Sequence, residues 1–268
     1  MDFSKLFSLE GRVAVVTGGS RGIGRMIAEG FIAAGCARVY ITARKAAVVE
    51  ETAKELGERC IPLPGDISNL AGIEALVAEL SARETQLDIL VNNAGVAWGA
   101  EFDDFPEIGW DKVMNLNVKT PFFLTQKLHG LLNASAASGR PAKVINIASI
   151  DGIKLNPWDT YSYHASKAAV LQLTRRMAAR LIRDNIVVSA IAPGAFPSEM
   201  NKAAAKQSDA VSKGIPSGRV GDTEDMAGGA IYLASRAGDY VVGTALPIDG
   251  GVVNASIPSD FVDPSGTT

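Results

Sequence analysis

The stretch TGGSRGIG, residues 17–24, decides the fold of this chain. It follows the apolar run VAVVTG at 13–18, and apolar residues then recur at helical spacing. These apolar positions are Ile23, Ile27, Phe31 and Ala34. Three glycines, Gly18, Gly22 and Gly24, let the backbone turn tightly and approach a pyrophosphate, which the following helix N-terminus attracts. The spacing differs from the general G-x-G-x-x-G fingerprint, and a tight turn without a ligand is the alternative. The strand–turn–helix context favours a nucleotide site.

The end of the next apolar run, RVYITAR, indicates which nucleotide binds. An NAD site usually has an acidic residue at the end of the second strand, where it contacts the ribose hydroxyls. Here Arg44 and Lys45 occupy that place, and no acid occurs between Glu29 and Glu50. A guanidinium matches a 2′-phosphate in a bidentate manner, and Arg21 stands in the glycine stretch. The pattern favours NADP(H) over NAD(H), with ordinary surface charges as the alternative interpretation of these cations.

Short runs rich in Val and Ile alternate with helix-like segments along the chain. The strand candidates are residues 13–18, 38–44, 60–66, 87–95, 143–149, 186–194 and 245–251. They are nearly continuous in apolar character, as in strands that are buried on both faces. Alternating strands and helices imply parallel βαβ units with right-handed crossovers. The sequence therefore predicts an α/β fold: a single-domain, doubly wound, seven-stranded parallel sheet with helices on both faces. Small and polar residues end these runs, where such sheets form their ligand crevice.

Composition and charge limit the possible partners. Of the 268 residues, 47% are apolar and 21% charged, and the net charge is −3. Nucleic-acid binders need clustered positive charge, so no nucleic-acid partner is expected. The two cysteines, Cys36 and Cys60, give neither a disulfide framework nor a metal-ligand spacing. No signal peptide or membrane-spanning run is evident, so we expect a cytoplasmic protein without a membrane partner or a metal.

The run YSYHASKAAV at 161–170 contains a possible proton donor. Tyr163 and Lys167 are four residues apart and so lie on one helical face, whereas Tyr161 has only Ala165 at that distance. A phenol has a pKa of about 10, and a nearby ammonium favours the phenolate and lowers that pKa. Such a phenol can protonate the oxygen of a carbonyl that receives a hydride. The Y-x-x-x-K spacing alone also occurs in ordinary amphipathic helices.

Two polar residues add to this pattern. Ser149 ends the preceding strand candidate, fourteen residues before Tyr163, and can donate a hydrogen bond to the same developing oxyanion. Asn117, in NLNVKT, lies in a helical segment, where a buried Asn needs hydrogen-bond partners. A role near Lys167, such as holding a water, would explain it, and a satisfied core Asn is the alternative.

Together these residues resemble the short-chain dehydrogenase/reductase family of the single-domain type. The motifs are TGGSRGIG, NNAG at 92–95, Asn117, Ser149, Tyr163-x-x-x-Lys167, Pro193-Gly194 and IDGG at 248–251. The resemblance runs from about residue 9 to residue 252. It implies a Rossmann fold with strand order 3-2-1-4-5-6-7.

The resemblance also implies roles for these residues. Tyr163 would be the catalytic acid/base, and Ser149 would hold the carbonyl. Lys167 would bind the nicotinamide ribose and lower the pKa of Tyr163, while Asn117 would anchor a water in a proton relay. The implied cofactor-binding residues are Gly18, Ser20, Arg21, Gly22, Ile23, Gly24, Arg44, Lys45, Asp66, Ile67, Asn93, Ala94, Gly95, Ile147, Tyr163, Lys167, Pro193, Gly194, Phe196 and Ser198.

The substrate is less sharply indicated. APGAFPSEM, the IP-x-GR-x-G run at 215–221 and GTALPIDGG resemble β-ketoacyl reductases, particularly those of rhamnolipid precursor synthesis. That resemblance implies a 3-oxoacyl thioester on acyl carrier protein or coenzyme A. The expected pocket rim is Val96, Trp98, Leu155, Trp158, Phe196 and Met200. These apolar and aromatic side chains equally suit a secondary-alcohol dehydrogenase or ketone reductase for sugars, steroids, or small or aromatic ketones.

Four further expectations concern organisation. The segment 195–218 contains small, polar residues and reads as a substrate-binding lid, and 254–268 reads as a C-terminal arm. Ser149 and Tyr163 are one residue further apart than is commonest in the family, so the loop between them is expected to reshape the pocket. The resemblance also implies a homo-oligomer, either a tetramer or a dimer.

Overall fold

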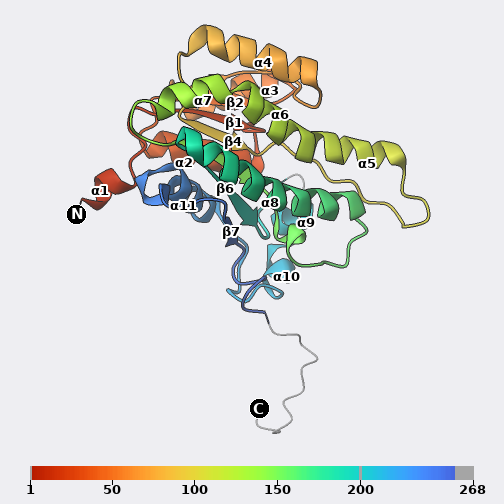
Figure 1. Cartoon of the computed structure of the whole chain (residues 1–268). Coiled ribbons are helices and arrows are strands. Elements are labelled where there is room, and N and C mark those ends of the chain that lie inside the picture. Colours follow the sequence, from red (N-terminus) through yellow and green to blue (C-terminus); the bar gives the residue numbers. More distant parts are fainter. Residues whose placement is uncertain (1, 199–200, 257–268) are drawn as a thin grey trace.

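A computed structural model of the chain describes residues 2–198 and 201–256, which form a parallel sheet between two layers of helices (Figure 1). The strands are β1 (Val13–Thr17), β2 (Arg38–Thr42), β3 (Cys60–Pro62), β4 (Ile89–Asn92), β5 (Ala142–Ile147), β6 (Ile186–Pro193) and β7 (Ala245–Ile248). Their order is β3-β2-β1-β4-β5-β6-β7, and every pairing is parallel. The predicted fold class and strand order are confirmed.

One layer of helices covers each face of the sheet (Figure 1). On one face, α2 (Gly22–Ala33), α3 (Ala46–Leu56) and α11 (Thr223–Ala234) bury Phe31, Val49 and Met226 in a shared core. The other face carries α4 (Leu70–Arg83), α5 (Glu107–Met114), α6 (Thr120–Lys127), α7 (His129–Ala136) and α8 (Tyr161–Leu181). Leu80, Leu124 and Met177 belong to its core. Within the described residues, no helix is both long and apolar enough to traverse a bilayer.

Short elements complete the chain. These are α1 (Phe3–Leu6), α9 (Lys202–Lys206), α10 (Ser208–Ser212), the π-helical η1 (Asn115–Lys119) and the 3₁₀ turns η2 (Ile150–Gly152), η3 (Ile182–Asp184) and η4 (Arg236–Gly238). The expected lid segment, 195–218, contains two short helices, α9 and α10. Most of the expected C-terminal arm lies outside the described residues.

The strands end earlier than the apolar runs predicted. The third run was expected to span 60–66 but pairs only over Cys60–Pro62, and the fourth, expected at 87–95, pairs only over Ile89–Asn92. The residues that follow leave the ladder and become loops at the carboxyl edge of the sheet. Because the chain turns in opposite directions from neighbouring β1 and β4, a crevice opens between the loops that follow them.

Buried charges close the opposite edge of the sheet. Asp88 accepts a hydrogen bond from Val13 N at 2.7 Å, and its carboxylate lies 3.3 Å from Arg12 Nη1. Arg12 also donates to Pro141 O at 2.6 Å, and its side chain is almost fully buried. The buried Lys143 pairs with Asp239 at 2.7 Å. These contacts join the amino ends of β1, β4 and β5.

Replacing Asp88 tests this closure. Asp88→Ala leaves Arg12 buried without its counterion, so the free energy of unfolding should fall by about 3–5 kcal/mol. Urea unfolding followed by circular dichroism measures it. Asp103→Ala, at an exposed acid, is the control and should change stability by less than about 0.5 kcal/mol. Equal effects of the two substitutions would contradict the importance of the buried pair.

Candidate active site

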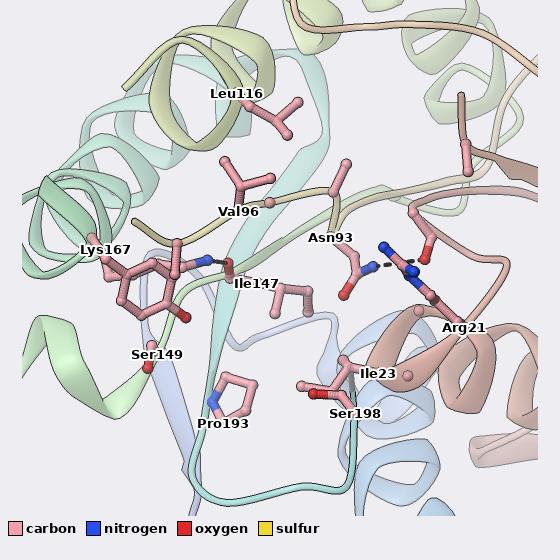
Figure 2. A pocket seen from close by; sticks show the side chains of 18 of the residues that line it. Arg21, Ile23, Asn93, Val96, Leu116, Ile147, Ser149, Lys167, Pro193 and Ser198 are labelled. Carbon is pink, nitrogen blue, oxygen red and sulfur yellow. Dashed lines mark hydrogen bonds between the residues drawn. The ribbon is translucent and has the colours of Figure 1, made fainter. Parts of the chain in front are cut away.

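A cavity of about 650 Å³ opens at the carboxyl ends of the strands. Its lining comes from the glycine-rich turn after β1, the ends of β2 to β6, and the helices α5 and α8. Figure 2 shows Ser149 and Lys167 at one end, and Arg21, Asn93 and Ile23 at the other. The cavity therefore brings the two halves of the predicted site into one space.

The turn after β1 has the shape that an anion-binding turn requires. Gly18 and Gly22 have positive φ values of 66° and 52°, a region that residues with a side chain rarely adopt. A Cβ at Gly24 would lie 2.4 Å from both Asn93 Nδ2 and Gly18 O, so no side chain fits there. Arg21, the N-cap residue of α2, has no acceptor on its side chain for the first amide groups of the helix. These amides lie at the cavity wall.

A hydroxyl joins this turn to the end of β4. Thr17 Oγ1 accepts hydrogen bonds from Asn93 N and Ala94 N, both at 2.9 Å, and donates to Val91 O at 3.2 Å. Asn93 Nδ2 donates to Thr17 O at 2.8 Å and to Gly18 O at 3.3 Å. The NNAG motif thus fixes the glycine turn from the side.

The residues at the end of β2 separate into two environments. Arg44 lines the cavity beside Thr42 and Ala43, and Asp66 and Ile67 line it from the segment after β3. Lys45 was expected to line the site too, but it does not. The strand ends at Thr42 and α3 begins at Ala46, so Lys45 becomes the exposed N-cap residue of that helix. Every other predicted cofactor residue lines the cavity.

Three of the four candidate catalytic side chains line the other end of the cavity. Lys167 Nζ donates to Ile147 O at 2.8 Å and lies 5.4 Å from the centre of the Tyr163 ring. Ser149 lies two residues after the end of β5, and its hydroxyl accepts a hydrogen bond from Asp151 N at 3.1 Å. Tyr161 lies outside the cavity lining, and its hydroxyl donates to Asp159 at 2.6 Å. The geometry therefore favours Tyr163 over Tyr161, as the helical spacing predicted.

Burial dominates the titration of this cluster. It raises the pKa of the Tyr163 phenol; the charge of Asp151 raises that pKa further, and a hydrogen bond with Ser149 lowers it. Burial also lowers the pKa of Lys167 to about 8, against the opposing effect of Asp151. The lowering of the Tyr163 pKa that was expected from Lys167 is not found in this structure, where burial and Asp151 raise that pKa and favour the neutral phenol.

Asn117 lies behind the cavity rather than in its wall. Its Oδ1 accepts from Val96 N at 2.9 Å, and its Nδ2 donates to Val96 O at 2.9 Å and to Ser166 Oγ at 3.0 Å. Ser166 in turn donates to Tyr163 O at 2.8 Å. The side chain occupies the π-helical segment η1, a feature frequent at functional sites. It links the loop after β4 to the helix that carries Tyr163.

The expected substrate residues are divided by the structure. Val96, Trp158 and the buried Phe196 line the cavity. Trp98 does not, because its indole packs against α5, where a Cβ at Gly109 would lie 2.7 Å from the ring. Leu155 is also outside the lining and is 85% exposed, since its loop projects into solvent. Met200 lies outside the described residues.

Several cavity residues were not predicted. Asp151 follows Ser149 by two positions, and an acid so close to a strand end was the available signal. Lys112 and Leu116 face the cavity from α5 and η1, one helical turn apart, and that spacing before Asn117 could have identified them. Thr160 and Asn201 also line it, and nothing in their sequence context marks them.

Comparison with known proteins identifies the scaffold. A family model described as Enoyl-(Acyl carrier protein) reductase matches residues 18–253. The chain is 48% identical over 250 residues to the rhamnolipids biosynthesis 3-oxoacyl-[acyl-carrier-protein] reductase of Pseudomonas aeruginosa, covering 91% of this chain and 97% of that protein. It is 40% identical over 252 residues to the 2-dehydro-3-deoxy-D-gluconate 5-dehydrogenase of Escherichia coli, covering 91% and 96%.

A solved structure agrees with these sequence matches. The Pseudomonas aeruginosa RhlG/NADP active-site complex superposes with a TM-score of 0.89 at 48% identity, covering 92% of this chain and 98% of that one. The family-model match runs from the glycine-rich turn through the Tyr163 helix to the end of β7. This chain belongs to the short-chain dehydrogenase/reductase family.

Proposed function

We propose that this protein is an NADPH-dependent carbonyl reductase whose substrates are 3-oxoacyl thioesters of acyl carrier protein or coenzyme A. The observation that carries the proposal is the single cavity in which Ser149, Tyr163 and Lys167 face the glycine-rich turn. The 48% identity to a 3-oxoacyl-[acyl-carrier-protein] reductase over nearly the whole chain supports the substrate class.

The chain's own residues fit NADP(H). The position of Gly24 admits no Cβ, and the first amides of α2 lie at the cavity wall, as a pyrophosphate requires. Arg21 and Arg44 line the same end, where they would hold a 2′-phosphate. The proposed contacts continue from Asp66 and Ile67 at the adenine to Pro193, Gly194, Ile147 and Ser198 at the nicotinamide. NADPH, when bound, supplies the hydride.

Tyr163 supplies the proton in this proposal. The raised pKa of its phenol keeps the proton in place at neutral pH, ready for transfer to the carbonyl oxygen. The Ser149 hydroxyl accepts from Asp151 N and shares a hydrogen bond with Tyr163, and on substrate binding its hydrogen would turn to stabilise the same oxygen of the substrate. Lys167 keeps ammonium protons beyond the one given to Ile147 O, and these would reach the ribose and the phenol. Asn117 would also anchor a water for reprotonation.

The remaining lining suits an acyl chain. Val96, Trp158 and Phe196 give an apolar wall beside the catalytic cluster. We propose that the chain forms one domain. Residues 195–218 act as a lid over the cavity, which opens to admit the thioester. A sugar-directed dehydrogenase is the second candidate, because the Escherichia coli relative carries that activity in its name.

The proposal extends to assembly and location. Phe102 and Ile108 are 74% and 72% exposed near α5, and Tyr240 is 99% exposed before β7. Exposed apolar side chains of this kind support a homo-oligomer, a tetramer or a dimer. We place the protein in the cytoplasm, without a nucleic-acid or membrane partner.

The first test is NADPH oxidation with acetoacetyl-coenzyme A. We expect turnover by the wild type and a loss of about 10²–10⁴-fold in kcat for Tyr163→Phe, which lacks the proton donor. NADPH binding, followed by fluorescence titration, should survive in this variant. Tyr161→Phe is the matched control and should keep its activity. Full activity of Tyr163→Phe would refute the mechanism, and no thioester reduction by the wild type would refute the substrate class.

Arg44 should set the cofactor preference. Arg44→Ser removes a charged partner of the 2′-phosphate, so the Kd of NADPH should rise about 10–100-fold while that of NADH stays nearly constant. Lys45→Ser removes a neighbouring cation that lies outside the lining and serves as the control. If both variants raise the Kd of NADPH equally, the phosphate contact assigned to Arg44 is wrong.

The pH dependence of alcohol oxidation should report Asp151. Oxidation needs a deprotonated Tyr163, so its rate rises with pH. Asp151 raises the pKa values of both Tyr163 and Lys167, so Asp151→Asn should lower both values. The rising limb of kcat/KM for ethyl 3-hydroxybutyrate and NADP⁺ should therefore move to lower pH, while that of Asp159→Asn should not. A shift to higher pH would contradict this electrostatic assignment.

A further inference from the structure

We propose that Asp151 selects substrates by charge. Its carboxylate, at the cavity wall beside Tyr163, repels compounds with an anionic group close to the reacting carbonyl and admits neutral thioesters, esters and ketones. This inference rests on the proposed carbonyl reduction at Tyr163 and deepens it by naming the substrate charge that the site accepts.

Two hydrogen bonds hold Asp151 in place. Its backbone N–H donates to Ser149 Oγ at 3.1 Å, which ties it to one of the groups that would contact the substrate oxygen. Its Oδ1 accepts from Asn156 Nδ2 at 2.9 Å. The carboxylate is only partly buried and lines the cavity, so a ligand there meets a fixed negative charge.

Gly152 brings this charge close to the catalytic helix. A Cβ at Gly152 would lie 2.7 Å from the carbonyl carbon of Lys167 and 2.8 Å from Ala168 N. Only a residue without a side chain allows η2 to pack so closely on the backbone of α8. Asp151, the preceding residue, therefore stays beside the turn of α8 that carries Tyr163 and Lys167.

The same loop places an apolar side chain, Trp158, in the cavity wall together with Asp151. Asn156 Oδ1 accepts from Trp158 N at 2.9 Å, so one side chain fixes both Asp151 and the Trp158 backbone. Trp158 lines the cavity with Asp151. This wall offers an indole surface to a hydrocarbon chain and a carboxylate to any approaching anion, a combination that favours neutral acyl compounds.

The other ionisable groups of the cavity do not cancel this charge. Arg21, Arg44 and Asp66 line the end assigned to the nucleotide. Lys112 comes from α5, where its Nζ lies 5.4 Å from the centre of the Trp98 ring. Lys167 is only 5% exposed and donates to Ile147 O. Asp151 is the acid of the cavity wall whose charge acts on both Tyr163 and Lys167.

The proposal distinguishes the two candidate substrate classes. The gluconate compound in the name of the Escherichia coli relative is a carboxylate, whereas the thioester carbon of a 3-oxoacyl substrate is uncharged. A fixed carboxylate disfavours the first by Coulomb repulsion in a partly desolvated cavity and leaves the second unaffected.

The test compares two compounds that share one reacting carbonyl, ethyl acetoacetate and freshly neutralised acetoacetate. The readout is the ratio of their kcat/KM values with NADPH at pH 7, so changes in chemistry common to both compounds cancel. Asp151→Asn should lower the ester-to-acid ratio about tenfold or more, as removal of one like charge predicts. Asp159→Asn removes a nearby acid outside the cavity lining and should leave the ratio unchanged.

A binding measurement keeps the outcome independent of turnover. We expect calorimetric titration of the NADP⁺-loaded protein to show that Asp151→Asn lowers the Kd of butyrate about tenfold relative to the Kd of butyramide. An unchanged ratio in both experiments, or a ratio that Asp159→Asn changes equally, overturns the inference. Wild-type protein that fails to reduce acetoacetyl-coenzyme A while Asp151→Asn still shifts these ratios would refute the proposed thioester function and leave the charge selection intact.

Discussion

The Thr17 hydroxyl, at the fork between β1 and β4, is the contact on which the arrangement of the site depends. It accepts hydrogen bonds from two backbone amides that follow β4. The side-chain amide of Asn93 in turn donates to two carbonyl oxygens of the glycine-rich turn. These loops diverge in opposite directions, so without such a tie the crevice between them would have no fixed width. Because the tie uses backbone groups that would otherwise need water, it holds the turn while leaving the first amides of α2 available to a phosphate.

The two edges of the sheet divide the tasks of stability and binding. At the amino edge, Arg12 pairs with Asp88, and Lys143 pairs with Asp239. Val13 N donates to Asp88 there, and Pro141 O accepts from Arg12. At the carboxyl edge the strands stop early and the polar groups line a cavity instead. Asn117 and Ser166 then connect the loop after β4 to the Tyr163 helix, so the nucleotide end and the proton-donating end are held as one unit.

Sequence patterns predicted the features that depend on local spacing. Nearly continuous apolar runs identified all seven strands, and the four-residue spacing singled out Tyr163 over Tyr161. What the patterns could not predict depends on contacts between distant segments. Trp98 turns away because Gly109 leaves room for its ring, and Asp151 reaches the site because Gly152 fits against α8. Arg44 lines the cavity, whereas Lys45 does not, because Lys45 is the N-cap residue of α3, which begins at Ala46.

Burial affects the two members of the Tyr163–Lys167 pair in opposite directions, raising one pKa and lowering the other. Desolvation alone would therefore favour a neutral phenol beside a neutral amine. Asp151 raises both values, which keeps the proton on Tyr163 and also helps Lys167 to stay protonated. A carboxylate placed here thus supports the protonation state that reduction needs, while its charge limits which carbonyl compounds can approach. The loop between Ser149 and Tyr163 thereby couples proton donation to substrate choice through a single side chain.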